Sequence, residues 1–238
     1  MESVKGKYIL VAGATGGIGA ETARLLAGSG AHVFLAGRNE KKLQEVAQQL
    51  QLPEGRTCAI DISQPADVAR LQQRYFEVFP TIDILINATG VGIIKPVDQL
   101  TEEDFLTSLH TNLFGSFLLV KSFLPAMKEA KKGLIVNIPG VLGKVPMAGA
   151  AAYSASKYGL VGMMQSIREE LKRTEIRITN LFLGGVDSPF WDTIDLRVQK
   201  DKMIRSTEAA KAIWFLCQQP ASGVVSEMVL QPFNHQAI

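Results

Sequence analysis

The sequence predicts an α/β fold in which one doubly wound parallel sheet carries helices on both faces. Short apolar runs alternate along the chain with stretches of helical length, which is the pattern of repeated strand–helix–strand units. The runs are apolar at consecutive positions, as expected for strands that are buried on both faces. No linker, repeat or low-complexity segment interrupts the alternation, so we expect a single domain over residues 1–238.

The expected elements follow in chain order. Each strand is a short apolar run, and each helix is a crossover long enough to join parallel strands. The expected strands are residues 8–13, 32–37, 57–60, 82–87, 134–138, 176–182 and 228–230. The expected helices are residues 18–28, 41–50, 64–78, 102–130 (as one helix or two), 152–174 and 207–218.

Composition narrows the classes of partner. With 47% hydrophobic and 20% charged residues and a net charge of +2, the chain is globular and carries no charge excess that would favour nucleic acid or a membrane surface. A small-molecule partner is therefore expected. The first strand begins close to Met1 and leaves no room for a signal peptide, and no apolar run is long enough to span a bilayer, so a cytoplasmic protein is expected.

Cysteine and histidine give no sign of a metal site or a disulfide. Cys58 and Cys217 lie far apart in unlike segments, which suits buried thiols in a reducing compartment. His32, His110 and His235 lack metal-ligand spacing, so we expect them to be structural or on the surface.

A glycine-rich turn follows the first expected strand. VAGATGGIG places Gly13, Gly17 and Gly19 between a strand and a helix. Glycines there allow a tight turn and let the backbone approach a pyrophosphate at the helix N-terminus. The alternative is an ordinary βα turn. The position after the first strand favours nucleotide binding.

The end of the second expected strand indicates which nucleotide. An NAD site places an acid there to accept from the ribose 2′-hydroxyl, but this chain has Gly37 followed by Arg38. A guanidinium binds a phosphate dianion well, so Arg38 favours NADP(H). Lys41 and Lys42 fit better as solvated charges at a helix start.

Several motifs together resemble the short-chain dehydrogenase/reductase family, in its branch with short subunits. The matching positions are the glycine turn at residues 12–19, Asp61 in AIDIS, residues 87–90 (NATG), Asn112 in HTNLFGSF, and Tyr153 with Lys157 as Y-x-x-x-K. The resemblance covers nearly the whole chain and implies a Rossmann fold that binds NADP(H). The cofactor contacts that it implies are Gly13, Thr15, Gly17, Ile18, Gly19, Arg38, Asp61, Ile62, Asn87, Ala88, Gly90, Tyr153, Lys157, Val186 and Ser188.

Tyr153 and Lys157 are the expected catalytic pair, with Asn112 as a third catalytic residue. Positions four apart share a face of a helix, so both side chains should reach one cleft. A nearby ammonium favours the phenolate and is expected to lower the phenol pKa. The resemblance further implies that Lys157 holds the nicotinamide ribose and that Asn112 holds a proton-relaying water. The alternative for YSASK is close helix packing through small residues.

The chain also departs from the family pattern. The family's catalytic serine ordinarily lies thirteen positions before the tyrosine, where this chain has Gly140, and residues 138–152 contain no serine or threonine. Gly184 and Gly185 stand where the family usually has Pro-Gly, which should loosen the following loop. These departures raise the question of whether the reaction is weakened, and Gly140→Ser is expected to raise turnover.

Two functions fit these observations. The first is NADPH-dependent reduction of a carbonyl, with Tyr153 as proton donor; the substrate is a hydrophobic ketone, aldehyde or quinone, or alternatively a 3-oxoacyl thioester. The second is an NADP(H)-binding sensor or subunit with little turnover. Phe190 and Trp191 are candidates to line an apolar pocket, and core packing is the alternative for Trp191. The stretch at residues 111–127 is apolar nearly all round, which indicates burial against another subunit as well as its own sheet; the alternative is a core helix in a monomer. The resemblance to the family implies a homodimer or homotetramer.

Overall fold

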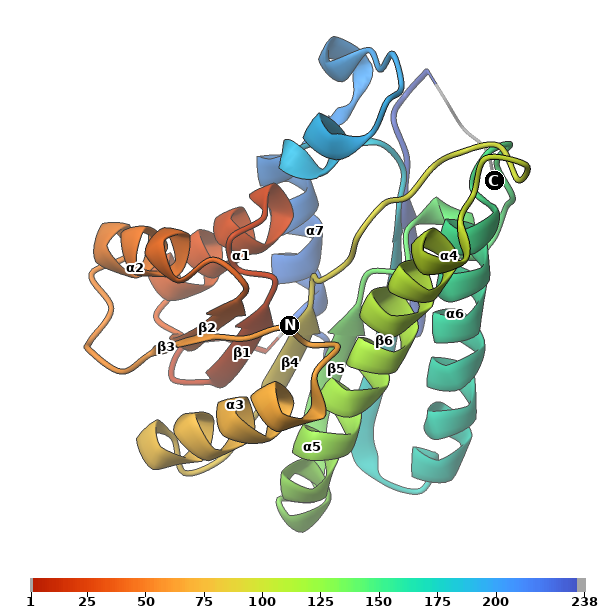
Figure 1. The fold of residues 1–238 in the computed structure, drawn as a ribbon. Coiled ribbons are helices and arrows are strands. Elements are labelled where there is room, and N and C mark those ends of the chain that lie inside the picture. The colour runs from red at the N-terminus through yellow and green to blue at the C-terminus, as the bar shows by residue number, and fades with distance from the viewer. Residues whose placement is uncertain (1, 235–238) are drawn as a thin grey trace.

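The computed structural model describes residues 2–234 and contains a wholly parallel seven-stranded sheet of order β3-β2-β1-β4-β5-β6-β9 (Figure 1). The strands of this sheet are β1 (Tyr8–Ala12), β2 (His32–Gly37), β3 (Thr57–Ala59), β4 (Ile84–Asn87), β5 (Lys132–Asn137), β6 (Glu175–Leu183) and β9 (Glu227–Leu230). Two short strands, β7 (Val186–Asp187) and β8 (Ile204–Arg205), form a separate parallel pair. The expected α/β fold is confirmed.

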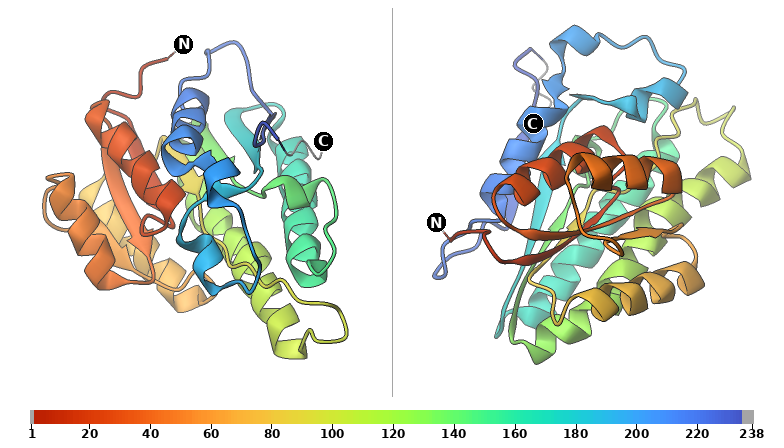
Figure 2. Two further views of the ribbon diagram at one scale, coloured as in Figure 1. Left: turned by 90° about the horizontal axis from the view of Figure 1, so that it is seen from above. Right: turned by 90° about the vertical axis from the view of Figure 1, so that its left-hand side faces the viewer.

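Helices cover both faces of the sheet, as the two views of Figure 2 show. One face carries α1 (Gly17–Gly28), α2 (Glu40–Gln49) and α7 (Ser206–Leu216), and the other carries α3 (Pro65–Val78), α5 (Gly115–Glu129) and α6 (Ala151–Leu171). Each face has its own buried apolar layer, because consecutive strand residues point to opposite sides. In β1, Ile9 packs in the layer with Leu26 of α1, whereas Leu10 packs in the layer with Phe123 of α5.

Local sequence accounts for where several helices begin. The Asn39 side chain accepts from Lys42 N (2.9 Å) and caps α2, and Pro65 occupies the first turn of α3, where its missing N–H is not needed. Thr101 and Asp104 form a reciprocal capping box at the start of α4 (Glu102–Leu109).

The expected helical region at residues 102–130 is helical throughout but not uniform. A π-helical turn, η1 (His110–Phe114), joins α4 to α5. Such turns are rare in proteins overall, and those that do occur often lie at functional sites. Here the turn contains Asn112, which is fully buried.

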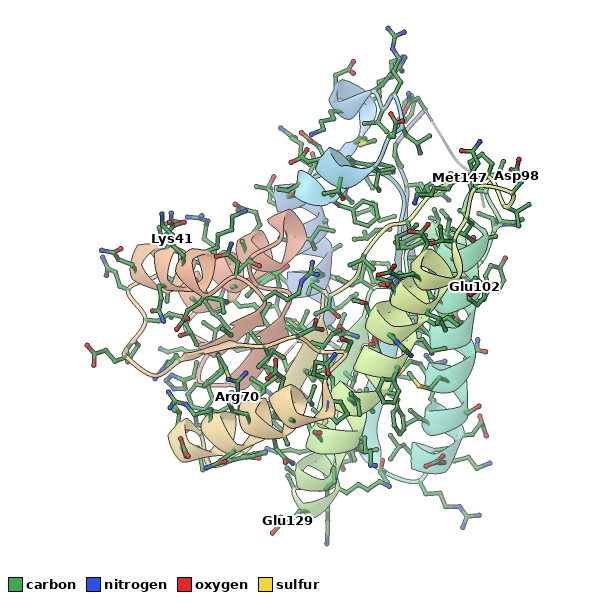
Figure 3. All side chains as sticks on the ribbon, in the orientation of Figure 1. Lys41, Arg70, Asp98, Glu102, Glu129 and Met147 are labelled. Carbon is green, nitrogen blue, oxygen red and sulfur yellow. The ribbon has the colours of Figure 1, made fainter. Side chains whose placement is uncertain are left out.

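The remaining expectations about side chains can be compared with residues 2–234. Cys58 and Cys217 are free and buried, as expected. His32 stacks on Tyr8 with ring centroids 5.2 Å apart, and His110 lies beside a phenylalanine ring; His235 is outside the described residues. Charged side chains such as that of Lys41 project from the periphery (Figure 3). Within the described part of the chain, no helix has the length and apolarity needed to cross a membrane, and no group of acidic, histidine and cysteine side chains could hold a metal.

Candidate active site

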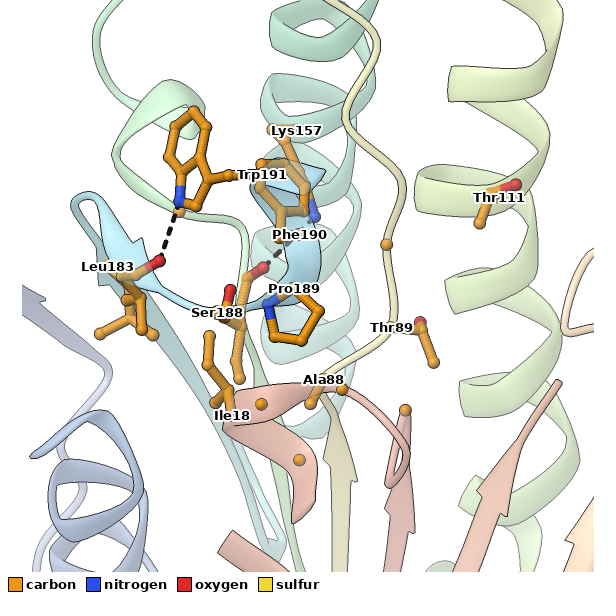
Figure 4. Close-up of a pocket in the computed structure, with 18 of the residues that line it drawn as sticks. Ile18, Ala88, Thr89, Thr111, Lys157, Leu183, Ser188, Pro189, Phe190 and Trp191 are labelled. Carbon is orange, nitrogen blue, oxygen red and sulfur yellow. Dashed lines mark hydrogen bonds between the residues drawn. The ribbon is translucent and has the colours of Figure 1, made fainter. Parts of the chain in front are cut away.

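A cavity of about 370 Å³ opens at the carboxyl ends of the central strands (Figure 4). The strand order reverses between β1 and β4, and the loops that follow these two strands diverge there, which is the usual ligand position in open α/β sheets. The lining runs from the glycine turn at one end to Tyr153 and Lys157 at the other. One cavity thus joins the two motifs that the sequence singled out.

The glycine turn lines one end of the cavity and requires glycine at its first position. Gly13 has φ +86°, and a Cβ atom there would lie 2.5 Å from the backbone oxygen of Ala88. Thr15 lies against Gly37, where a Cβ would be 3.2 Å from the threonine Oγ1. The turn therefore brings the start of α1 close to the ends of β2 and β4.

Arg38 and Asp61 line the same end. Arg38 is exposed and forms no ion pair with another residue in the range 2–234. Asp61 is oriented by Ser63, whose backbone N–H (2.9 Å) and hydroxyl (2.8 Å) both donate to Asp61 Oδ1. A free guanidinium and a fixed carboxylate thus face the space beyond the glycine turn.

Tyr153 and Lys157 lie one turn apart on α6 and both line the other end of the cavity. Lys157 Nζ lies 5.4 Å from the centroid of the Tyr153 ring and donates to the backbone oxygen of Ile138 at 3.3 Å. Lys157 is only 3% exposed, so this carbonyl and the phenol ring fix a cation inside the protein. The predicted juxtaposition of the two side chains is confirmed.

Burial shifts the pKa values of both groups. It raises the pKa of the Tyr153 phenol above its usual range and lowers the pKa of Lys157 to about 8. The structure thus differs from the expectation that the lysine lowers the phenol pKa, because desolvation by burial dominates at both groups. A phenol that remains protonated at neutral pH is suited to donate a proton.

Asn112 lies behind the cavity wall rather than in it. Its Oδ1 accepts from Val91 N (2.8 Å), and its Nδ2 donates to Val91 O (3.0 Å) and Ser156 Oγ (3.0 Å). Ser156 Oγ in turn donates to the backbone oxygen of Tyr153 at 2.7 Å. The asparagine therefore ties the segment after β4 to α6, the helix that carries Tyr153 and Lys157. A relay water at Asn112 stays a prediction.

All the expected cofactor residues except Asn87 line the cavity. Asn87 is 2% exposed, and its Nδ2 donates to Ser116 Oγ (2.8 Å) and Asn137 Oδ1 (3.3 Å), so its side chain holds neighbouring elements together. The sequence did not point to several apolar and hydroxyl residues of the lining, because only the fold brings them here. They are Ile94, Thr111, Ile138, Val141, Leu142, Met147 and Leu183.

Gly140 faces the phenol of Tyr153. A Cβ atom at this position would lie 4.0 Å from Tyr153 Oη and 3.5 Å from the backbone oxygen of Leu183. The backbone at Gly140 has φ +71° and ψ 169°, a conformation that is essentially restricted to glycine. A side chain at this position would therefore point at the Tyr153 hydroxyl, but the backbone conformation suits a residue without a side chain.

Phe190 and Trp191 also line the cavity, so the pocket alternative holds for both. They belong to η3 (Pro189–Thr193), within the segment between β6 and α7 (Figure 4). The ring centroids of Phe190 and Tyr153 are 5.9 Å apart, and Trp191 Nε1 donates to Val186 O at 2.8 Å. Gly184 lies against Pro232, whose Cδ would be 2.6 Å from a Cβ at position 184. The Gly184 departure therefore makes room for the chain after β9.

The family model for short chain dehydrogenases matches residues 7–198. The chain belongs to this family. Like other short-chain dehydrogenases, it is an oxidoreductase: it is 30% identical to an uncharacterised oxidoreductase of Staphylococcus epidermidis over 232 residues, which cover 98% of this chain and all of the relative. An uncharacterised oxidoreductase of Staphylococcus saprophyticus is likewise 30% identical, with 98% and 100% covered.

Solved structures give the same assignment for this short-chain dehydrogenase. A metagenomic short-chain oxidoreductase in complex with NADP has a TM-score of 0.83 and 31% identity, covering 97% of this chain and 99% of the other. A variant of the actinorhodin polyketide ketoreductase with NADPH has a TM-score of 0.85 and 27% identity, with 98% of each chain covered. An alcohol dehydrogenase of Thermococcus sibiricus, 23% identical with a TM-score of 0.89, shares the fold; 98% of this chain and 100% of that one are covered.

Proposed function

We propose that this short-chain dehydrogenase is an NADPH-dependent reductase of apolar ketones, aldehydes or quinones. The observation that carries the proposal is the single cavity that places a glycine turn and an unpaired arginine at one end and a protonated phenol beside a buried lysine at the other. The first end suits a phosphorylated dinucleotide, and the second suits proton donation to a carbonyl oxygen.

The residues present fit NADP(H). Gly13 and Gly90 leave space that a side chain would fill: a Cβ at Gly90 would lie 3.2 Å from Asn112 Oδ1 and 3.3 Å from Lys157 Nζ. Arg38 would pair with the 2′-phosphate, and no carboxylate at the end of β2 opposes it. The remaining contacts are proposed at Thr15, Gly17, Ile18, Gly19, Asp61, Ile62, Ala88, Val186 and Ser188, all of which line the cavity.

The chain's own catalytic contribution is a proton transfer. When bound, NADPH supplies a hydride to the carbonyl carbon. Tyr153 Oη donates its proton to the carbonyl oxygen as that oxygen becomes an alcohol, and the cation of Lys157 stabilises the phenolate that remains. Lys157 would also hold the ribose of the bound cofactor. Asn112 keeps the helix of the pair in place through Ser156.

The lining of the substrate end favours an uncharged, apolar substrate. The charged side chains that line the cavity, among the described residues, are Arg38, Asp61 and Lys157, and each has a place in the cofactor site or in catalysis. The lining formed by residues 2–234 therefore has no further cation to hold a substrate carboxylate or phosphate. A 3-oxoacyl thioester is the second candidate, which the likeness to a polyketide ketoreductase supports.

A second function, an NADP(H)-binding protein with little turnover, is favoured by Gly140. Position 140 lies beside Tyr153 Oη but supplies no second hydroxyl to donate to the substrate carbonyl oxygen. Loss of one such donor reduces turnover by roughly 100- to 1,000-fold in other enzymes.

The deciding experiment is NADPH oxidation with a panel of ketones, aldehydes, quinones and a 3-oxoacyl thioester, together with NADPH binding by fluorescence. Tyr153→Phe should abolish turnover and leave NADPH affinity nearly unchanged, because it removes the proton donor but little contact surface. Turnover that survives in Tyr153→Phe would place the chemistry elsewhere. Tight NADPH binding with no turnover of any carbonyl would establish the binding function instead.

We also propose a homodimer or homotetramer. The surface of α4, η1, α5 and α6 carries an apolar groove lined by Leu109, His110, Leu113, Phe114, Phe117, Gly159 and Met163. Phe114 and Phe117 are each 38% exposed there. A second copy of the chain would remove this surface from water.

A further inference from the structure

We propose that the ring of Phe190, seated on Gly92, sets the width of the substrate space beside Tyr153 and determines which ketones the protein accepts. This inference rests on the proposed reductase function. It concerns the β6–α7 segment, defined as residues 184–205, whose turn η3 closes one side of the cavity.

The ring occupies a notch that exists only because residue 92 is glycine. A Cβ atom at Gly92 would overlap Phe190 Cζ and would lie 2.8 Å from Phe190 Cε2 and 2.8 Å from Ile194 Cδ1. Real Cβ atoms essentially never approach so closely, so an alanine at 92 and the present ring position are incompatible. Two side chains of the β6–α7 segment therefore rest on the loop after β4.

The other side of the ring faces the reacting groups. Its centroid lies 5.9 Å from that of Tyr153, with the planes at 51°, and 5.3 Å from that of Trp191, with the planes at 88°. Phe190 and Trp191 line the cavity, whereas Gly92 does not. The ring thus stands as a wall between the loop after β4 and the substrate space.

The base of the segment is held as well. Trp191 Nε1 donates to Val186 O (2.8 Å), and Ser206 Oγ donates to Asp187 O (2.7 Å). At Gly17, a Cβ would lie 3.0 Å from Ser188 Cβ and 3.3 Å from Pro189 Cδ, so the segment also rests on the glycine turn. Because these contacts hold the base of the segment, the Phe190 ring cannot move away from Gly92 without losing packing contacts. A substrate must then direct a narrow, unbranched substituent toward the Phe190 ring.

The test uses Phe190→Ala, Gly92→Ala and the double variant, with Gly162→Ala as the matched control. Gly162 is exposed on α6, and a Cβ there would meet nothing within 4 Å. Two quantities are measured: amide hydrogen exchange of residues 188–196 in the cofactor-free protein, and the ratio of kcat/KM for a straight-chain methyl ketone to that for a tert-butyl methyl ketone with NADPH.

Phe190→Ala should lower the ratio about tenfold by admitting the branched ketone, since hydrophobic pockets discriminate between substrates by about this factor per group. Gly92→Ala should displace the ring and speed exchange of residues 188–196 about tenfold. The double variant should behave like Phe190→Ala, because the overlap with the ring is gone and the Ile194 methyl group can rotate away. Gly162→Ala should match the wild type in both quantities.

An unchanged ratio in a Phe190→Ala protein that reduces both ketones would overturn the proposal. So would wild-type exchange in Gly92→Ala, or effects that add in the double variant. If no variant reduces any ketone, the reductase function fails, and the preference for the slim ketone is then measured as binding to the NADPH complex by cofactor fluorescence. A preference that Phe190→Ala leaves unaltered would refute the role of the ring independently of turnover.

Discussion

Replacing Gly140 tests whether the missing hydroxyl limits the rate. A Cβ at this position would lie 4.0 Å from Tyr153 Oη, with its nearest other neighbour, Leu183 O, at 3.5 Å, so a serine side chain has room beside the phenol. Its Oγ, one bond further on, could donate to the same carbonyl oxygen. A well-placed donor of this kind contributes about 2.7–4 kcal/mol to catalysis.

Backbone strain opposes this gain. With φ +71° and ψ 169°, a side chain at position 140 should destabilise the fold by about 1–3 kcal/mol. Gly140→Ala carries the same strain without the hydroxyl and is therefore the matched control. Urea unfolding should show similar losses of stability in Gly140→Ser and Gly140→Ala, which would separate strain from chemistry.

We expect Gly140→Ser to raise kcat on a simple activated ketone about tenfold over the wild type, which recovers about 1.4 kcal/mol of the donor's contribution. Gly140→Ala should stay at or below the wild-type rate, and NADPH affinity should be unchanged in both. Equal rates in the serine and alanine variants would refute the reasoning. A fast wild type unaffected by serine would show that water or the substrate already replaces the hydroxyl.

Three further predictions concern the cofactor, the lysine and assembly. The wild type should bind NADPH at least tenfold more tightly than NADH, a difference of about 1.4 kcal/mol in binding free energy. Arg38→Ala should erase most of this difference, whereas Lys41→Ala should not. Equal affinities of the wild type for NADPH and NADH would contradict the Arg38 assignment. Burial lowers the pKa of Lys157 from 10.5 to about 8 in the folded, cofactor-free chain. Between pH 8 and pH 10.5 the unfolded chain therefore binds a proton that the folded chain does not, so the free energy of unfolding should rise with pH in this range. Relative to Lys157→Met, the free energy of unfolding of the wild type, measured with urea, should increase by about 2 kcal/mol between about pH 8 and 10. A stability difference between the two proteins that does not change with pH would show that the lysine is not desolvated. Light scattering at micromolar concentration should give an oligomer that Phe117→Asp dissociates, whereas a monomeric wild type would refute assembly.

The fold and most of the cavity lining follow from local sequence. Apolar runs that alternate with helical crossovers admit few arrangements other than a parallel sheet. Gly13 directly follows the first strand, where the backbone lies too close to Ala88 for a side chain. The spacing of Tyr153 and Lys157 on one helix was enough to place both in one cleft. Periodicity and short-range spacing carry this information because they act within a few residues.

Tertiary structure decided the features that depend on distant contacts. Burial of Tyr153 and Lys157 by the surrounding elements, and not their mutual spacing, sets the direction of both pKa shifts. Local sequence motifs predict that Asn87 and Asn112 are both site residues, yet the side-chain amides of both form hydrogen bonds to other buried residues of the protein. The seating of Phe190 on Gly92 joins positions almost a hundred residues apart, and no local pattern records it. Desolvation and steric fit depend on everything that surrounds a group, so the sequence determined which groups are present and the fold determined what each can do.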